Sequence, residues 1–284
     1  MVTVDSSPRV LLICTDPHLG LALEQELINR QCVLERAFNN AEGLKRVRCA
    51  PYDVVITDPA TTIEDDLALF AGLRYFQPKT KVIVLAPAGT SDDILSALRQ
   101  DVFFCKCAPF SASEIADYAR AATSGSREGF QILSASKNWI SVRMNASLFT
   151  GDRLLSFLKQ LQSELPKRSR EELMTAVGEM VRNAIEHGTH FDSLKFVEVA
   201  AVRTRRSIVF YISDPGEGFR LDAIPHAAVS NTADAPAQHI HVRESHGMRP
   251  GGYGILLSQG IVDELIYNEK GNQVLLIKYL DPGN

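Results

Sequence analysis

The sequence lacks several features that mark specialised classes of protein. No apolar run reaches the roughly 18 to 20 residues that a membrane-spanning helix needs, and Met1 to Pro8 contains no apolar signal-peptide core. Lys and Arg number 30 against 34 Asp and Glu, so the formal net charge is -4. That balance gives no basic surface for nucleic acid or for an anionic membrane. These absences predict a cytoplasmic protein that binds neither nucleic acid nor membrane.

Cysteine is also sparse, and its spacing argues against a zinc site. The closest pair, Cys105 and Cys107, is two residues apart and has no second pair to complete a ligand set. Three of the five cysteines lie in or beside apolar runs, which favours buried thiols in a reducing compartment.

What is present is enough chain for two α/β domains. The sequence has 284 residues, of which 45% are hydrophobic, so each half can build its own core. Residues 1–122 repeat a strand-then-helix pattern five times, which predicts a five-stranded parallel, doubly wound sheet. Residues 123–129 are polar and glycine-containing and read as a linker. Residues 130–284 form the second domain.

The second domain has a different order of elements. Two strand-like runs come first, two helical segments follow, and the later strands alternate apolar and polar residues. This order predicts an α/β sandwich. The first helical segment starts at Thr150-Gly151-Asp152 and carries the leucines of Leu154 to Leu165. The second is Arg168 to His187, and a short helix follows at Ile255 to Val262.

The run from Tyr52 to Asp58 ends an apolar strand with an acid at its carboxyl end. Together with the five repeated units, this run resembles the receiver domain of bacterial response regulators over about residues 8–122. The resemblance implies that Asp58 occupies the position of the phosphorylated aspartate. Magnesium, held by acids after the first strand, would neutralise the phosphoryl group there.

The sequence departs from the receiver pattern at each supporting position. Cys14 and Thr15 stand where the acid pair belongs, and Ala86 replaces a Thr or Ser. Ala108 falls where a Lys is expected, and Lys106 can compensate only from the opposite face or with a local shift. Without these groups an acyl phosphate lacks charge neutralisation. We therefore expect a pseudo-receiver, in which Asp58 is a solvated carboxylate at the start of an Asp-Pro turn.

The helix around Glu179 carries a polar ridge beside an apolar stripe. Glu179, Asn183 and His187 are spaced by four and line up on one face. An Asn amide oxygen can ligate magnesium, and a Glu can deprotonate a nucleophile. The pattern alone is also typical of an ordinary amphipathic helix.

Two glycine-containing segments follow strands or precede helices. Asp214-Pro215-Gly216-Glu217-Gly218 comes directly after a strand, where an acid can accept a hydrogen bond from the exocyclic amine of adenine. Gly252-Tyr253-Gly254 enters a helix, where free amides bind phosphate. Taken alone, the first segment is equally typical of an ordinary turn, and the second of a glycine that allows close packing at a helix start.

In this order and spacing, the three segments resemble the Bergerat-fold, histidine-kinase-like ATPases. The likeness is greatest to the anti-sigma-factor serine kinases of partner-switching systems, through Asn183-Ala184-Ile185-Glu186-His187-Gly188. The resemblance implies that ATP and Mg²⁺ bind here. The roles implied are Glu179 as catalytic base, Asn183 as magnesium ligand, His187 as a site residue, Asp214 with Gly216 and Gly218 for adenine, Gly252 and Gly254 for phosphate, and Arg249 as the catalytic lid arginine.

Two positions depart from that family. Asn272 stands where many relatives have Thr near the adenine. The segment between Phe219 and Gly251 is long and holds His226, His239, His241 and His246. We interpret it as a polar lid, with a metal site as the alternative. Both departures bear on nucleotide affinity and turnover more than on the fold.

The leading functional hypothesis is therefore an anti-sigma-factor protein serine kinase in a partner-switching pathway, with the pseudo-receiver as input. Its partners would be a sigma factor or an antagonist protein, and a homodimer is a further expectation. The alternative is a non-catalytic, ATP-dependent protein-binding switch. A histidine kinase is disfavoured because residues 130–178 contain no His that could accept a phosphoryl group.

Overall fold

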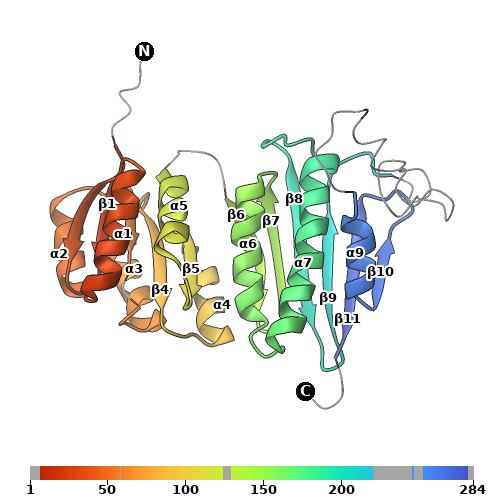
Figure 1. The fold of residues 1–284 in the computed structure, drawn as a ribbon, viewed down its shortest axis with the longest axis horizontal. Coiled ribbons are helices and arrows are strands. Elements are labelled where there is room, and N and C mark those ends of the chain that lie inside the picture. Colours follow the sequence, from red (N-terminus) through yellow and green to blue (C-terminus); the bar gives the residue numbers. More distant parts are fainter. Residues whose placement is uncertain (1–6, 58, 124–128, 220–244, 246–251, 281–284) are drawn as a thin grey trace. The chain divides into compact units, whose positions relative to one another are not determined.

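A computed structural model describes residues 7–57, 59–123, 129–219, 245 and 252–280, and the chain divides into two compact units, 1–126 and 127–284 (Figure 1). Among the described residues, none of the helices combines the length and apolarity needed to cross a membrane.

The first unit is a parallel sheet with helices on both faces. Its strands run in the order β2-β1-β3-β4-β5. Helix α1 packs against α5, whereas α3 packs against both α2 and α4, so two groups of helices cover the two faces. The strands are β1 (Arg9–Ile13), β2 (Val33–Ala37), β3 (Val54–Ile56), β4 (Lys81–Ala86) and β5 (Phe104–Cys107). The helices are α1 (Pro17–Asn29), α2 (Asn40–Cys49), α3 (Ile63–Phe76), α4 (Ser91–Arg99) and α5 (Ala112–Thr123).

Burial and capping explain why these segments take these forms. Strand β1 is apolar at every position after Arg9, and Val10 to Ile13 are buried because helices cover both sheet faces. Four helices begin at a residue whose side chain accepts a backbone N–H, each such cap contributing about 1 kcal/mol. The capping residues are Asp16, Asn39, Thr62 and Thr90.

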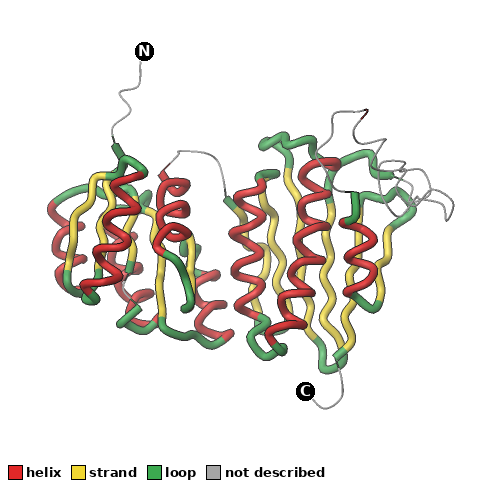
Figure 2. The backbone as a smooth tube through the Cα atoms, in the orientation of Figure 1, coloured by secondary structure: helices red, strands yellow, loops and turns green. Residues whose placement is uncertain are grey.

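The second unit is a two-layer sandwich. Its six strands are all antiparallel, in the order β10-β11-β9-β8-β7-β6, and α6, α7 and α9 lie side by side on one face of the sheet (Figures 1 and 2). The strands are β6 (Phe130–Ser136), β7 (Trp139–Asn145), β8 (Phe196–Arg203), β9 (Ser207–Ser213), β10 (Glu264–Tyr267) and β11 (Gln273–Tyr279). The helices are α6 (Leu148–Leu161), α7 (Lys167–Asn183) and α9 (Gly254–Ile261). Alternate residues of β9, such as Ile208, Phe210 and Ile212, are buried, as expected for a sheet covered on one face.

Two helices differ from the sequence prediction. Helix α6 begins at Leu148 rather than at Thr150-Gly151-Asp152, because Ser147 caps it by accepting the Thr150 N–H, and it ends at Leu161 rather than Leu165. The predicted helix that ends at His187 is α-helical only to Asn183. It continues as one wider π-helical turn, η1 (Ala184–Gly188), and such turns are frequent at functional sites.

Candidate nucleotide site

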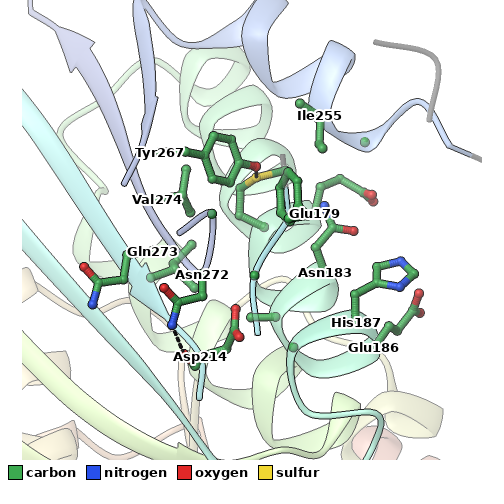
Figure 3. A pocket seen from close by; sticks show the side chains of 18 of the residues that line it. Glu179, Asn183, Glu186, His187, Asp214, Ile255, Tyr267, Asn272, Gln273 and Val274 are labelled. Atoms are coloured by element: carbon green, nitrogen blue, oxygen red, sulfur yellow. Dashed lines mark hydrogen bonds between the residues drawn. The ribbon is translucent and has the colours of Figure 1, made fainter. Parts of the chain in front are cut away.

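A cavity of about 610 Å³ opens beside α7 in the second unit. Its wall comes from α7 and η1, the loop after β9, the β10–β11 hairpin and the start of α9 (Figure 3). Seven of the predicted site residues line it: Glu179, Asn183, His187, Asp214, Gly218, Gly252 and Gly254. Gly216 lies behind the wall, where an added Cβ would come within 2.6 Å of the Gly188 carbonyl oxygen. Arg249 lies outside the described residues.

The polar ridge faces the cavity as predicted from its spacing. Glu179, Asn183 and His187 follow one another along α7 and η1 (Figure 3). The Glu179 Oε1 atom lies 3.5 Å from Nη1 of Arg182. Its Oε2 atom faces Gly254, where an added Cβ would lie only 2.6 Å away. The absence of a side chain at Gly254 therefore lets the carboxylate sit against the start of α9.

Asp214 follows β9 and contacts both Gly216 in its own loop and Gly188 at the end of η1. Its Oδ1 accepts the Gly216 N–H at 2.8 Å. A Cβ on Gly188 would lie 2.2 Å from the Asp214 carboxyl carbon, so the glycine that ends η1 makes room for this acid. Burial raises the pKa of Asp214, and the Gly216 hydrogen bond and the Lys270 charge oppose that shift. One carboxylate oxygen is thus fixed, which leaves the other as an acceptor.

The loop after β9 and the β10–β11 hairpin interlock through two glycines. Gly218 has φ 78° and Gly271 has φ 79°, conformations that favour glycine. An added Cβ on Gly218 would lie 2.0 Å from the Lys270 carbonyl oxygen. One on Gly271 would lie 1.9 Å from the carbonyl oxygen of Phe219. The two segments therefore meet backbone to backbone at the floor of the cavity.

The start of α9 offers backbone donors to the cavity. Gly252, with φ 95°, and Gly254 bracket the helix start at Tyr253. The side chain of the N-cap residue, Tyr253, makes no capping hydrogen bond to this helix. The first-turn N–H groups of a helix have no partner within it, and the helix dipole favours an anion there. The segment is therefore suited to phosphate.

Several wall residues were not predicted from the sequence. Tyr267 is the most informative of them. Its hydroxyl donates to the Met180 sulfur at 3.1 Å, and its ring packs edge to face on Phe219 with 5.1 Å between the ring centroids. Burial raises the pKa of Tyr267. The only sequence signal was its place at the end of the predicted strand Glu264 to Tyr267. Ile212 and Val274 add apolar walls beside it, as a flat base would require.

The strand ends of the first unit look different. Cys14 is buried and its thiol donates to the Asp16 carbonyl oxygen at 3.3 Å, while the Asp16 carboxylate caps α1. Lys106 Nζ pairs with Glu114 in the first turn of α5 at 2.8 Å, so this amine already has an acidic partner. Ala86 is buried at the end of β4. Asp58 lies outside the described residues.

A family comparison agrees with this geometry. Residues 150–278 match the family model of the histidine kinase-like ATPase domain. The chain joins a receiver fold to a histidine kinase-like ATPase domain. The matched range covers α6, α7, α9 and four strands, and it contains every wall element of the cavity. A nucleotide is therefore the class of ligand that this ATPase domain implies.

Two curated relatives share parts of the chain. The transcriptional regulatory protein GlrR of Escherichia coli is 33% identical over 95 residues, 34% of this chain and 21% of that protein. The serine-protein kinase RsbW of Oceanobacillus iheyensis is 26% identical over 113 residues, 39% of this chain and 66% of that protein. The chain thus spans about a fifth of the first relative and just under two thirds of the second.

Solved structures also resemble the chain over part of its length. A response regulator from Thermotoga maritima matches 42% of this chain and 99% of its own, with 23% identity and a TM-score of 0.39. The receiver domain of nitrogen regulatory protein C matches 43% of this chain and 98% of its own, with 24% identity and a TM-score of 0.38.

Proposed function

We propose that this chain is a signalling regulator whose ATPase domain binds Mg-ATP and transfers the terminal phosphoryl group to a serine of a partner protein. The observation that carries the proposal is the convergence of Glu179, Asn183, Asp214 and Gly254 on one cavity. The likeness to the kinase RsbW supports the choice of a protein acceptor. The receiver unit would act as the input, and a sigma factor or its antagonist as the partner.

Adenine recognition rests on Asp214. Because Oδ1 is held by the Gly216 N–H, Oδ2 is the atom left to accept a hydrogen bond from the exocyclic amine of adenine. Apolar side chains of Ile212 and Val274, with the ring of Tyr267, line the same cavity and suit the faces of a purine.

Magnesium fits the donor set at the other end of the cavity. Magnesium prefers oxygen ligands and usually keeps water and phosphate oxygens as partners. Asn183 and Glu179 present such oxygens, and no cluster of three acidic, His or Cys side chains capable of holding a metal occurs within the described ranges. We assign Asn183 as the protein ligand. The ion would neutralise phosphate charge during transfer.

Glu179 is the group placed to take the serine proton. Its carboxylate lies against the start of α9, where the phosphates would bind, and it is the acid of α7 nearest to that point. Arg182 lies 3.5 Å away and offsets part of its charge. In this proposal Arg249, which lies outside the described residues, acts as the lid arginine.

Calorimetry with Mg-ATP tests the proposal first. We expect the wild-type chain to bind ATP only with Mg²⁺, and Asn183→Ala and Asp214→Asn to weaken binding by about tenfold or more each, as for loss of a charge-assisted hydrogen bond or ligand. The matched control is Gln131→Ala, which removes an exposed amide from the far edge of the same sheet. Absence of ATP binding by the wild type would refute the proposal.

Transfer to protein is the second step of the test. An extract of the source cells incubated with the chain and γ-labelled ATP should yield a phosphoserine protein. ATP binding without any phosphoprotein would instead favour the non-catalytic binding switch. The replaced positions at the receiver strand ends, Cys14, Ala86 and Ala108, show that one unit of this chain already departs from catalytic sequence requirements, which is why this alternative is kept.

A further inference from the structure

Two asparagines of the β10–β11 hairpin form a relay of hydrogen bonds. Asn268 Oδ1 accepts three backbone N–H groups, from Gly271 at 2.8 Å and from Asn272 and Gln273 at 3.1 Å each. Its own amide nitrogen donates to Asn272 Oδ1 at 3.0 Å. Asn268 therefore closes the turn and at the same time orients the side chain of Asn272.

The relay ends on the backbone of the adenine-side acid. Asn272 Nδ2 donates to the Asp214 carbonyl oxygen at 2.9 Å (Figure 3). In the opposite direction, the Asp214 N–H donates to the Asn272 carbonyl oxygen at 3.1 Å. The main chain of Asp214 is thus held on both sides by one residue, and its carboxylate is held by Gly216.

The backbone contacts between the loop after β9 and the hairpin indicate what this relay does. The loop after β9 reaches the hairpin through Gly218 and Gly271, both with positive φ, so no side chains between them fix their separation. The β9–β11 ladder ends at the pair of Ser213 and Gln273, directly before this loop. The paired bonds between Asn272 and Asp214 extend that pairing by one residue and hold the start of the loop against the hairpin.

We propose that Asn272 is a positioning residue that sets adenine specificity by fixing Asp214 where its free carboxylate oxygen meets the exocyclic amine. The inference rests on the proposed function, because it assumes that a nucleotide base enters this cavity. It also explains the replacement of Thr by Asn here: an amide has both the donor that reaches the Asp214 carbonyl and the acceptor that takes the Asn268 amide.

Comparison of ATP with inosine triphosphate isolates this role. The base of inosine triphosphate carries a carbonyl where adenine carries the amine, so it offers an acceptor to the Asp214 carboxylate. We expect the wild type to prefer Mg-ATP by about 100-fold or more, as for a site built to bind one polar group. Asn272→Ala should lower ATP affinity about tenfold and leave inosine triphosphate affinity unchanged. The ratio of the two affinities is independent of the fraction of chain that is folded.

A double-mutant cycle separates positioning from direct contact with the base. If Asn272 acts through Asp214, then Asp214→Asn with Asn272→Ala should bind ATP no more weakly than Asp214→Asn alone. If the two losses multiply, Asn272 contacts the base itself and the inference is wrong. Asn272→Thr, which restores the hydroxyl common in relatives but cannot make both bonds of the relay, should behave like Asn272→Ala.

The outcomes distinguish the inference from the proposed function. Failure of the wild type to bind either nucleotide would overturn the proposed function. Binding of ATP with an unchanged ATP-to-inosine triphosphate ratio in Asn272→Ala would overturn only the inference. Thermal unfolding of each variant, with Gln131→Ala as the control, identifies any general loss of structure.

Discussion

Both units have buried apolar cores, but the residues at the ends of their strands make different contacts. In the ATPase domain, residues from four separate segments converge on one cavity, and Gly188 and Gly254 make room for Asp214 and Glu179. In the receiver unit, the thiol of Cys14 bonds locally and Lys106 is paired with a helix acid. Packing and chemistry are thus separable, because buried strands and helix caps maintain a fold whether or not its site is complete.

The largest effect should come from the proposed base. Glu179→Gln should slow phosphoryl transfer by about 10² to 10⁴-fold, since positioned bases contribute that much, while Mg-ATP affinity changes by only a few-fold. Quantification of phosphoserine formed under single-turnover conditions measures this. Glu171→Gln, an exposed acid on the same helix, is the control. Equal rates for both variants would remove Glu179 from the chemistry.

Glycine sterics should produce the next effect. Gly271→Ala must place a Cβ against the Phe219 carbonyl oxygen at φ 79°, which should destabilise the ATPase unit by roughly 2 to 3 kcal/mol. Gly260→Ala has open space and a helical conformation, so it should be neutral or stabilising by about 0.5 to 1 kcal/mol. Urea unfolding of the two variants gives the comparison, and equal midpoints would contradict it.

In the receiver unit, a smaller and pH-dependent effect should come from a buried acid. Asp66 is fully buried, and Asn40 donates to its Oδ1 at 3.0 Å. Its Oδ2 and the Asn40 Oδ1 have no hydrogen-bond partner among the described residues. Burial raises the pKa of Asp66, although the Thr57, Asn40 and Thr61 hydrogen bonds oppose the shift. Burial therefore favours the neutral form of Asp66 in the folded unit.

The sign of the pH dependence follows from that raised pKa. A group that holds its proton more tightly when folded stabilises fully below its unfolded pKa, and that stability is lost as pH rises through the folded pKa. Asp66→Asn supplies a permanent donor, so at pH 7 it should be more stable than the wild type by on the order of 1 kcal/mol. The difference should disappear near pH 4. Urea unfolding at both pH values, with exposed Glu64→Gln as control, decides between this and a structural role for the charge.

The smallest expected effect is that acetyl phosphate does not phosphorylate the receiver unit. Acetyl phosphate with Mg²⁺ should leave Asp58 unphosphorylated by intact-mass measurement, because Cys14, Thr15 and Ala108 supply neither acid pair nor Lys. A variant carrying Cys14→Asp, Thr15→Asp and Ala108→Lys provides the comparison and should gain modification. A modified wild type would show that the receiver site retains its chemistry.

The sequence predicted the elements and three segments of the cavity, because hydrophobic periodicity, glycine positions and acids at strand ends are local signals. It placed Glu179, Asn183 and Asp214 on elements that the structure brings together. It placed the start of α6 at Thr150-Gly151-Asp152, two residues late, because the cap that Ser147 provides was not recognised. It also missed Tyr267 and Asn268, whose partners are fixed only by the pairing of distant strands.

The position of β11 has a kinetic consequence. This strand comes after every other described strand in the sequence, yet it pairs between β9 and β10, with Ser213 opposite Gln273. Pairings this distant form late, since a long loop must close before they contribute any stability. Asn272, adjoining β11, can engage Asp214 only after that step. A ligand in the cavity would therefore bind only completed molecules, and it would slow their unfolding by stabilising the pairing that forms last.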